Sequence, residues 1–509
     1  MRPVVVVGAG IGGLTLGALL AQAGERVIVL EAHSEPGGCA ATFFHRGFRF
    51  DAGATLAAGF APGMPMEQLG ERLGIRWEIR LEPVAMEVHL PDGTSVMRWA
   101  DREPWREERA RCFGSAAERF WAWQERTARA IWAMAMRRPP WPPQSIWDGG
   151  RLLQMGLGWV LEDVRRIGIM GAAFRPLADF IPSDQLRLRL FVDGQLLISA
   201  QALADRANAL YGAAALDFPH IGVGTVRGGV GGLARQLAEA VRRMGGEVLY
   251  RQEVTRVRRL SSGGIRVETA SGQAFEASHV VFDLPPADAA RLLGEGIPPA
   301  LRRAPLVPPD GWGAFVVYAG IRDAVVPRNL SLHHQILDGQ GWGEGHSVFL
   351  SISPAWDPER APPGCRALTI STHTALSPWW RMHEQNPTEY ATRKSAYVDR
   401  LLTLCERVLP GLRASLVEVE AATPVTFHRF TRRSLGWVGG FPQTHFGRSW
   451  RARLGDRLWL VGDSVFPGQS IPAVVLGAWR VAETILATIA CSYAWHRPAA
   501  GPLRGRRTA

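Results

Sequence analysis

The chain opens on "VVVVGAGIGG" (Val4–Gly13), a run of four valines followed by a glycine-rich turn. Four β-branched residues in a row predict a short buried strand of a parallel sheet. The turn matches the pattern GxGxxG: the first glycine permits a tight turn, the second lets a pyrophosphate approach the backbone, and the third lets the next helix pack close to the strand. We therefore expect a nucleotide-binding strand–turn–helix unit at this end of the chain.

The next stretch, "LTLGALLAQAGERVIVLE" (Leu14–Glu31), completes that unit. Residues 14–23 suit a helix, Gly24 ends it, and Arg26 to Leu30 form a second strand. Glu31 then places a carboxylate where it accepts both hydroxyls of an adenosine ribose and repels a 2'-phosphate. The cofactor is expected to be NAD or FAD rather than NADP. The expected contacts in this segment are Gly8, Ala9, Gly10, Ile11, Gly12, Gly13, Glu31 and Ala32.

Two other interpretations of this apolar stretch are a secretory signal peptide and a membrane anchor, since Arg2 precedes it and Ala21-Gln22-Ala23 follows. A signal peptide needs neither three glycines in this register nor a strand ending in an acid just after its cleavage site. A glycine-rich helix of this length spans a bilayer poorly. The pattern therefore favours a cofactor cradle.

The composition limits the classes of function. A length of 509 residues predicts two or three domains, and 47% hydrophobic with 21% charged residues is typical of a globular protein rather than a disordered or polytopic membrane protein. The net charge of +11 suggests an anionic partner, but no nucleic-acid-binding module is recognisable, so no nucleic acid is expected. The 19 tryptophans, together with arginine, favour a membrane interface.

Cysteine and histidine usage gives no metal or disulfide pattern. The five cysteines are far apart and form no CxxC pair, which indicates a reducing, cytoplasmic setting. His333-His334 has no ligand spacing to a third donor and is interpreted as structural, so no metal is expected.

The far end of the chain carries a second pattern, "RLWLVGDSVFPGQSIPAVVLGAWRVAETI" (Arg457–Ile485). It predicts a strand over residues 458–461, a turn at Gly462-Asp463, and a glycine- and proline-rich loop leading into a helix near Ala473. A plain NAD dehydrogenase would not need a second half-site so far downstream, which favours FAD.

With the segment "EAHSEPGGCAATFFHRGFRFDAGAT" (Glu31–Thr55), the chain resembles the flavin-containing amine oxidase superfamily, in particular its carotenoid desaturase and isomerase (phytoene desaturase-like) branch. Within it, bacterial C-3',4' carotenoid desaturases are the nearest in pattern. Cys39 departs from the arginine or serine that many relatives place after the Gly-Gly pair, which puts a side-chain phosphate contact there in doubt. The resemblance implies FAD, with Asp463 near the ribityl and phosphate groups, the loop from 468 to 473 against the flavin ring, and Val254 at the adenine. The further cofactor contacts that it implies are Gly38, Gly53, Ala54, Thr55, Val254, Gly462, Asp463, Gly468, Ile471, Pro472 and Ala473.

The expected fold class is α/β: a split Rossmann-type FAD-binding domain interleaved with a substrate domain that combines a mixed β-sheet and a helical cap. The FAD-binding parts are expected at 1–75, 216–290 and 431–490, and the substrate-domain parts at 76–215, with the tryptophan-rich cap, and 291–430. Residues 491–509 are expected to form a disordered basic tail. Residues 83–99 alternate around "PDG" and predict a hairpin of the substrate sheet.

The resemblance also implies the reaction. We expect desaturation of an acyclic carotenoid by hydride transfer to the flavin; the alternatives are carotenoid cis–trans isomerisation with redox-neutral use of FAD and, in another class, an escort-type lipid-binding protein of the same fold. No catalytic side chain matches a motif. Quinone or oxygen is the expected electron acceptor, because no second nucleotide fingerprint is present.

A membrane contact is expected for such a substrate. Moving a carotenoid of about forty carbons into water would cost on the order of 30 kcal/mol, so it must be drawn from a bilayer. We expect peripheral association with the inner face of the membrane, with Trp132, Trp141, Trp147 and Trp159 at headgroup depth. The alternative is that these helices simply pack as a cap over the substrate tunnel.

Overall fold

The first strand and helix form as the sequence predicts, with β1 at Val4–Val7 and α1 at Ile11–Gln22. A computed structural model describes residues 2–261, 263–308 and 311–496 of the chain. Every valine of β1 is buried, because the strand lies inside a six-stranded sheet of order β19-β20-β13-β1-β2-β9. The strands pair in parallel except for β19, which pairs antiparallel with β20 at the edge. The other strands are β2 (Val27–Leu30), β9 (Glu247–Leu249), β13 (His279–Phe282), β19 (Arg453–Gly455) and β20 (Leu458–Leu460).

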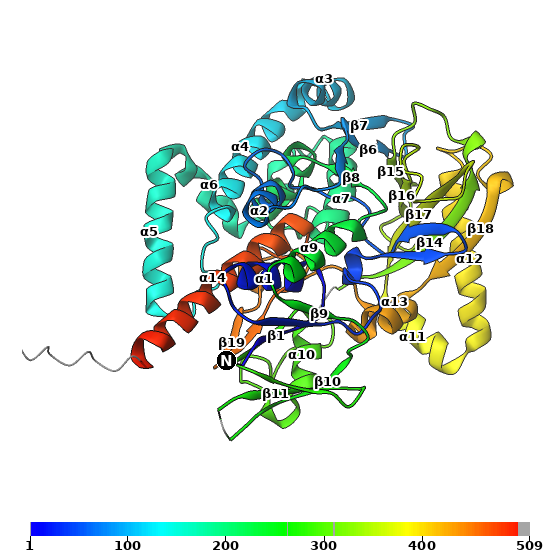
Figure 1. Cartoon of the computed structure of the whole chain (residues 1–509). Coiled ribbons are helices and arrows are strands. Elements are labelled where there is room, and N and C mark those ends of the chain that lie inside the picture. Colours follow the sequence, from blue (N-terminus) through cyan, green and yellow to red (C-terminus); the bar gives the residue numbers. More distant parts are fainter. Residues whose placement is uncertain (1, 262, 309–310, 497–509) are drawn as a thin grey trace, which may run out of the picture.

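Helices cover one face of this sheet, and a small three-stranded sheet covers the other (Figure 1). On the first face, α1 packs between α9 and α14, and Gly17 permits this because a Cβ there would lie 3.2 Å from Val29 of β2 and 3.6 Å from Val241 of α9. The helices on this face are α1, α2 (Pro65–Leu73), α9 (Gly231–Arg243) and α14 (Ile471–His496). The other face carries β10 (Val254–Arg259), β11 (Ile265–Thr269), β12 (Ala274–Ala277) and α10 (Pro286–Leu293).

A mixed seven-stranded sheet of order β18-β14-β17-β16-β15-β6-β7 forms the second body of the fold. Its pairs are antiparallel except β15 with β6. The predicted hairpin at 83–99 is confirmed as β6–β7. The strands are β6 (Val84–His89), β7 (Ser95–Trp99), β14 (Gly313–Arg322), β15 (His333–Leu337), β16 (Ser347–Ile352), β17 (Cys365–Thr374) and β18 (Leu416–Ala422). Helices α11 (Leu376–Gln385) and α12 (Pro387–Cys405) contribute to the core on its outer side, and α13 (Pro424–Thr431) follows β18.

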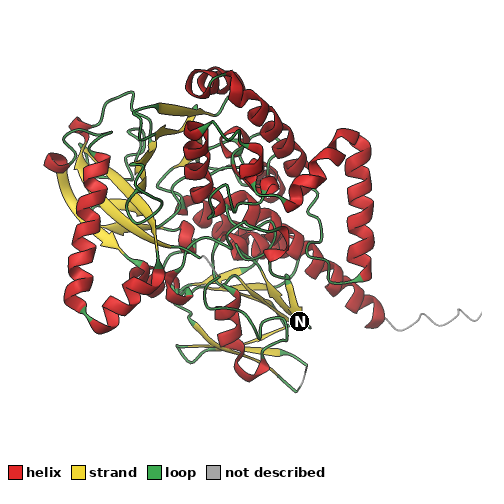
Figure 2. Cartoon of the chain, turned by 180° about the vertical axis from the view of Figure 1, so that it is seen from behind, coloured by secondary structure: helices red, strands yellow, loops and turns green. Residues whose placement is uncertain are grey.

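A helical cap stands above both sheets (Figure 2). Its helices are α3 (Arg102–Phe113), α4 (Glu118–Ala135), α5 (Ile146–Glu162), α6 (Ile167–Met170), α7 (Leu186–Ala200) and α8 (Ala209–Ala215). Two short ribbons, β3 (Thr42–His45) with β4 (Phe48–Asp51) and β5 (Ile79–Leu81) with β8 (Gly224–Val226), complete the fold.

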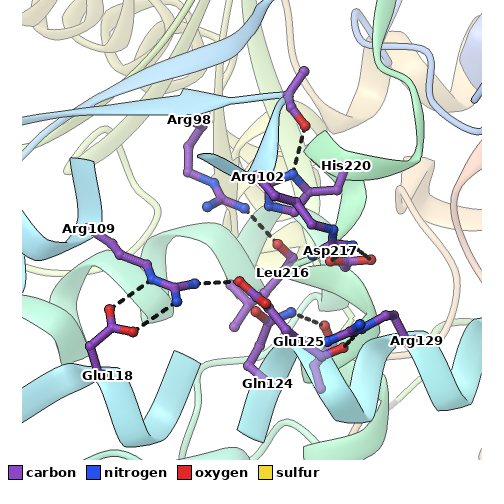
Figure 3. A network of polar contacts seen from close by, with 12 residues as sticks. Arg98, Arg102, Arg109, Glu118, Gln124, Glu125, Arg129, Leu216, Asp217 and His220 are labelled. Carbon is purple, nitrogen blue, oxygen red and sulfur yellow. Dashed lines mark hydrogen bonds and ion pairs between the residues drawn. The ribbon is translucent and has the colours of Figure 1, made fainter. Parts of the chain in front are cut away.

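A buried polar network fixes the cap to the seven-stranded sheet (Figure 3). Arg109 of α3 donates from Nε to Oε1 of Glu118 at 2.9 Å and from Nη1 to Oε1 of Glu125, on α4, at 2.5 Å. Arg98 of β7 donates from Nη2 to the carbonyl of Leu216 at 2.6 Å. Because Arg98, Arg109 and Glu125 are almost fully buried, the first two contacts hold α3 against α4, and the third holds β7 to the C-terminal end of α8.

The expected α/β fold class is confirmed. Strands of the six-stranded sheet come from residues 4–30, 247–282 and 453–460, with the segments of the second sheet and the cap between them. Helix α14 continues to His496, and the remainder of the expected basic tail lies outside the described residues.

Candidate functional site

A single cavity of about 1020 Å³ runs from the glycine-rich turn after β1 to the inner face of the seven-stranded sheet. Most of the residues predicted to contact the cofactor line it. These residues are Gly8, Gly10, Ile11, Gly12, Glu31, Ala32, Gly38, Gly53, Ala54, Thr55, Val254, Gly462, Asp463, Ile471 and Pro472. Ala9, Gly13, Gly468 and Ala473 are not among the described lining residues.

The backbone amides of Ala9 and Gly13 donate hydrogen bonds to carboxyl groups at the cavity, those of Glu31 and Asp283 respectively. The N–H of Ala9 donates to Oε2 of Glu31 at 2.8 Å, and the N–H of His33 donates to Oε1 at 2.8 Å. Both carboxylate oxygens of Glu31 are therefore fixed at the end of β2, facing the turn. Burial raises the pKa of Glu31, while these backbone hydrogen bonds and the nearby His33 lower it.

Asp283, which no sequence motif marks, lies at the centre of the turn. It follows β13, the parallel neighbour of β1, so it emerges at the same sheet edge as Gly8. A Cβ added at Gly10 would lie 2.4 Å from Oδ2 of Asp283, and one added at Gly12 or Gly462 would lie 2.8 Å from Oδ1. These glycines are therefore required for the close approach of the Asp283 carboxyl as well as for any ligand.

Arg433 is a second residue that the motifs did not reveal. Its Nη1 donates to Oδ2 of Asp463 at 2.8 Å, its Nη2 donates to the carbonyl of Gly439 at 2.8 Å, and its guanidinium lies 4.4 Å from the ring centroid of Trp437. Burial lowers the pKa of Arg433, but the Asp463 carboxylate outweighs that effect and raises it above the usual value. Within the described residues, Nε of Arg433 is buried without a hydrogen-bond partner. Nε is therefore a donor without a partner on a residue that lines the cavity.

Cys39 lies beside this guanidinium. Burial raises the pKa of the Cys39 thiol, and the positive charge of Arg433 opposes that effect. The cation that the chain lacks after its Gly-Gly pair is thus supplied next to Cys39 by a residue almost four hundred positions downstream. Arg433 precedes a short 3₁₀ turn (Ser434–Gly436), and no spacing rule connects it to the Gly-Gly pair.

The part of the cavity that lies against α7 and β15–β17 is neutral. Among the described lining residues from α7, β15, β16 and β17, His373 is the one titratable side chain. Burial lowers the pKa of His373 to about 4, so its imidazole is uncharged at neutral pH. Amides neighbour it: Nε2 of Gln201 lies 3.3 Å from Nε2 of His373, and Nε2 of Gln195 donates to Oε1 of Gln335 at 2.8 Å. An apolar molecule can lie here without desolvating a charge.

His334 does have neighbours that its sequence spacing did not predict. Nε2 of His89 lies 3.1 Å from Nδ1 of His334, and Oε2 of Glu87 lies 3.8 Å from the same atom. Nε2 of His334 lies 2.8 Å from the carbonyl of Ser331, and burial lowers the pKa of His334 to about 4. This hydrogen-bonded cluster on β6 and β15, in which the His334 imidazole is uncharged at neutral pH, is separate from the cavity.

Comparison with known proteins identifies the family. Residues 11–486 match the family model described as flavin containing amine oxidoreductase. The chain belongs to this family. It is 27% identical over 501 residues to prolycopene isomerase 2 of an Oncidium hybrid cultivar, covering 95% of this chain and 84% of that protein. It is 25% identical over 511 residues to the lycopene-forming phytoene desaturase of Pseudescherichia vulneris, covering 96% and 99%.

A solved structure has the same fold. An oxidoreductase from Methanosarcina mazei, 16% identical, superposes with a TM-score of 0.64 over 95% of this chain and 100% of that one. The family match confirms the expectation of FAD, and the chain is an FAD-dependent oxidoreductase.

The cavity of this flavin oxidoreductase fits the cofactor. Glycines border the part of the cavity next to β1, Glu31 presents a fixed carboxylate there, and the buried Nε of Arg433 offers an unused donor. A carboxylate at the end of β2 suits a ribose, and a guanidinium suits a pyrophosphate.

Proposed function

We propose that this FAD-dependent oxidoreductase introduces a double bond into an acyclic carotenoid. One observation carries the proposal: the cavity is continuous from the glycine turn to the strands β15–β17, whose lining residues are uncharged, and Glu420 of β18 is the charged residue that the seven-stranded sheet contributes to the described lining. Such a cavity suits a long apolar substrate with one end against the cofactor. The phytoene desaturase and prolycopene isomerase among its relatives support a substrate of this class.

In this proposal the cofactor is held along the whole cradle. The ribose hydroxyls bond to Glu31, and the backbone of Val254 contacts the adenine. The pyrophosphate lies over the glycine turn near Arg433. Gly462 and Asp463 contact the ribityl chain, and the loop from Gly468 to Ala473 lies against the flavin ring. Gly38, Gly53, Ala54 and Thr55 complete the contacts.

When bound, FAD supplies a two-electron oxidant that accepts a hydride equivalent from one substrate carbon. Release of a proton to solvent from the neighbouring carbon would turn the C–C single bond into a double bond. A quinone or oxygen would take up the two electrons and complete the cycle. The chain itself positions the polyene and keeps water out, since the α7 and β15–β17 walls of the cavity are built from apolar, hydroxyl and amide groups together with one neutral imidazole.

The second candidate function is carotenoid cis–trans isomerisation without net oxidation. The 27% identity to prolycopene isomerases over 95% of this chain favours it. The two functions differ in product mass, which makes them separable in one assay.

The test is to incubate the FAD-loaded protein in liposomes with lycopene or an earlier acyclic carotenoid, following product mass and flavin absorbance together. A loss of two hydrogens with bleaching of the flavin is the result expected for a desaturase. An unchanged mass with a shifted carotenoid spectrum would establish the isomerase instead. An unchanged carotenoid with every acyclic substrate would contradict both.

A peripheral contact with the inner face of the membrane is part of the proposal, but the surface differs from the one expected from the sequence. Trp132 and Trp159 are 7% and 6% exposed and belong to the protein core, so their placement at headgroup depth is wrong. Trp141 is half-buried and donates to the carbonyl of Phe446, whereas Trp147 is 82% exposed.

The membrane-contacting surface in this proposal is instead an apolar face on α5 and the segment that follows it. Its exposed side chains are Ile146, Trp147, Leu153, Leu157, Leu161, Val164, Ile167, Met170 and Phe174. Figures 1 and 2 both show α5 standing away from the body of the molecule, on the side where α14 projects. One described helix, at 471–491, is apolar and long enough to cross a membrane, but half of it is buried within the protein. Arg165, which is 84% exposed in the 3₁₀ turn after α5 and pairs with Asp163, adds a cation beside this apolar face, and such a combination suits an anionic bilayer surface.

A further inference from the structure

Asp283 is a carboxyl group placed where the cofactor brings negative charge. It is half-buried between the turn at 8–13 and the turn at 462–463, and it lines the cavity. Oδ2 accepts the N–H of Gly13 at 2.9 Å. In the described part of the chain no other hydrogen bond reaches this carboxyl. An ionised carboxylate usually needs several donors when it is buried.

The charges around Asp283 do not favour its ionisation. Asp463 and Glu31 are the carboxylates that face it, and Arg433 is the cation, but Arg433 is already paired with Asp463 at 2.8 Å. The thiol of Cys39 is the remaining titratable group nearby. The pKa of Asp283 is raised to about 7: burial raises it most, the carboxylates of Asp463 and Glu31 raise it as well, and the Gly13 hydrogen bond and Arg433 partly oppose them. A bound pyrophosphate adds two negative charges and raises it again.

We propose that Asp283 binds FAD in its protonated form, donating a hydrogen bond from its carboxylic acid to a pyrophosphate oxygen while the other oxygen accepts the N–H of Gly13. Above the pKa of the FAD-free protein, each FAD that binds is then accompanied by one proton taken from solvent. The inference rests on the FAD cofactor and the cradle geometry and is independent of the substrate class.

The proton linkage predicts how tightly FAD is held at each pH. Uptake of one proton on binding weakens FAD affinity about tenfold for each pH unit once the pH is well above that pKa, so the Kd should rise about fiftyfold between pH 7 and pH 9. Below pH 6 the affinity should be nearly constant. An asparagine in place of Asp283 would keep a donor and an acceptor at the same point without titrating. The variant D283N should therefore hold FAD with a Kd that hardly changes over this range.

The experiment dilutes the FAD-loaded full-length protein at each pH and measures the Kd from the fluorescence of released flavin. E82Q is the matched control, because burial also raises the pKa of Glu82, which does not line the cavity. In E82Q the Kd for FAD should rise with pH as it does in the natural protein, whereas in D283N it should not change with pH. A natural protein with no slope, or a D283N variant with the natural slope, would overturn the proposal.

An infrared measurement covers the case in which D283N fails to fold. The FAD-loaded natural protein should show the carbonyl stretch of a protonated carboxylic acid at pH 7.5, and the band should be absent from D283S, whose hydroxyl also donates but does not titrate. A spectrum of the natural protein without such a band would contradict protonation of Asp283 directly. Neither readout uses a carotenoid, so a failure of the proposed reaction leaves both results interpretable.

Discussion

Replacing Arg433 by methionine should destabilise the protein and loosen FAD at the same time. The side chains of Arg433 and Asp463 are 12% and 19% exposed, and their ion pair measures 2.8 Å. Removing one partner of a buried pair leaves the other charge uncompensated, which costs about 3–5 kcal/mol. If Nε of Arg433 also donates to the pyrophosphate, the loss of a charged hydrogen bond weakens FAD binding by roughly ten- to a hundredfold.

The assay is urea unfolding of the FAD-loaded protein, read by tryptophan fluorescence, with released flavin measured in parallel. R429M is the control, because Arg429 lies on α13, carries the same charge and is exposed. R429M should change the unfolding free energy by less than about 1 kcal/mol. The double variant R433M/D463N should recover part of the loss, since it leaves no unpaired carboxylate. An R433M protein as stable as R429M, with its FAD retained, would refute this account of the cradle.

Three further predictions concern pH, the cap and the membrane surface. In FAD-free protein the pKa of Asp283 lies at about 7, against an ordinary 3.8, so its carboxyl group contributes its full stability below about pH 4. That contribution is lost as the pH rises from about 4 through 7. Over this window the advantage of D283N over the natural protein in thermal unfolding should grow to at most about 4 kcal/mol. R109M should lower the unfolding free energy by about 3–5 kcal/mol, because it leaves the carboxylate of Glu125, 7% exposed, without its cation. The control R111M changes a side chain that is 58% exposed and should cost under about 1 kcal/mol. Equal urea midpoints for the two variants would contradict this prediction. W147E should reduce flotation with anionic liposomes severalfold at unchanged stability, and a protein that stays in the soluble fraction at low salt before mutation would exclude the membrane contact.

The parts of the fold that the sequence predicts are those encoded by local rules. Four valines, a glycine turn and an apolar stretch place β1, α1 and β2 close to their observed bounds, because period, turn chemistry and burial agree there. Glu31 is predicted from the same segment as a ribose ligand, whereas the hydrogen bond that its carboxylate accepts from Ala9 is seen only in the structure.

Contacts between distant segments could not be predicted this way. Asp283 reaches Gly13 across 270 residues, and Arg433 reaches Asp463 only because the tertiary fold brings their two loops together. Burial of Trp132 and Trp159 likewise depends on tertiary packing: Nε1 of Trp159 donates to the carbonyl of Ala130 inside the cap. The number of tryptophans in a segment does not show which of them are buried and which face solvent.

Anaerobic mixing of the FAD-loaded protein with one equivalent of an acyclic carotenoid in liposomes tests the central claim most directly. With no acceptor present, the account predicts that flavin absorbance bleaches once and that one new double bond forms for each flavin reduced. A product with an added double bond while the flavin stays oxidised, or a bleached flavin with the carotenoid unchanged, would contradict it.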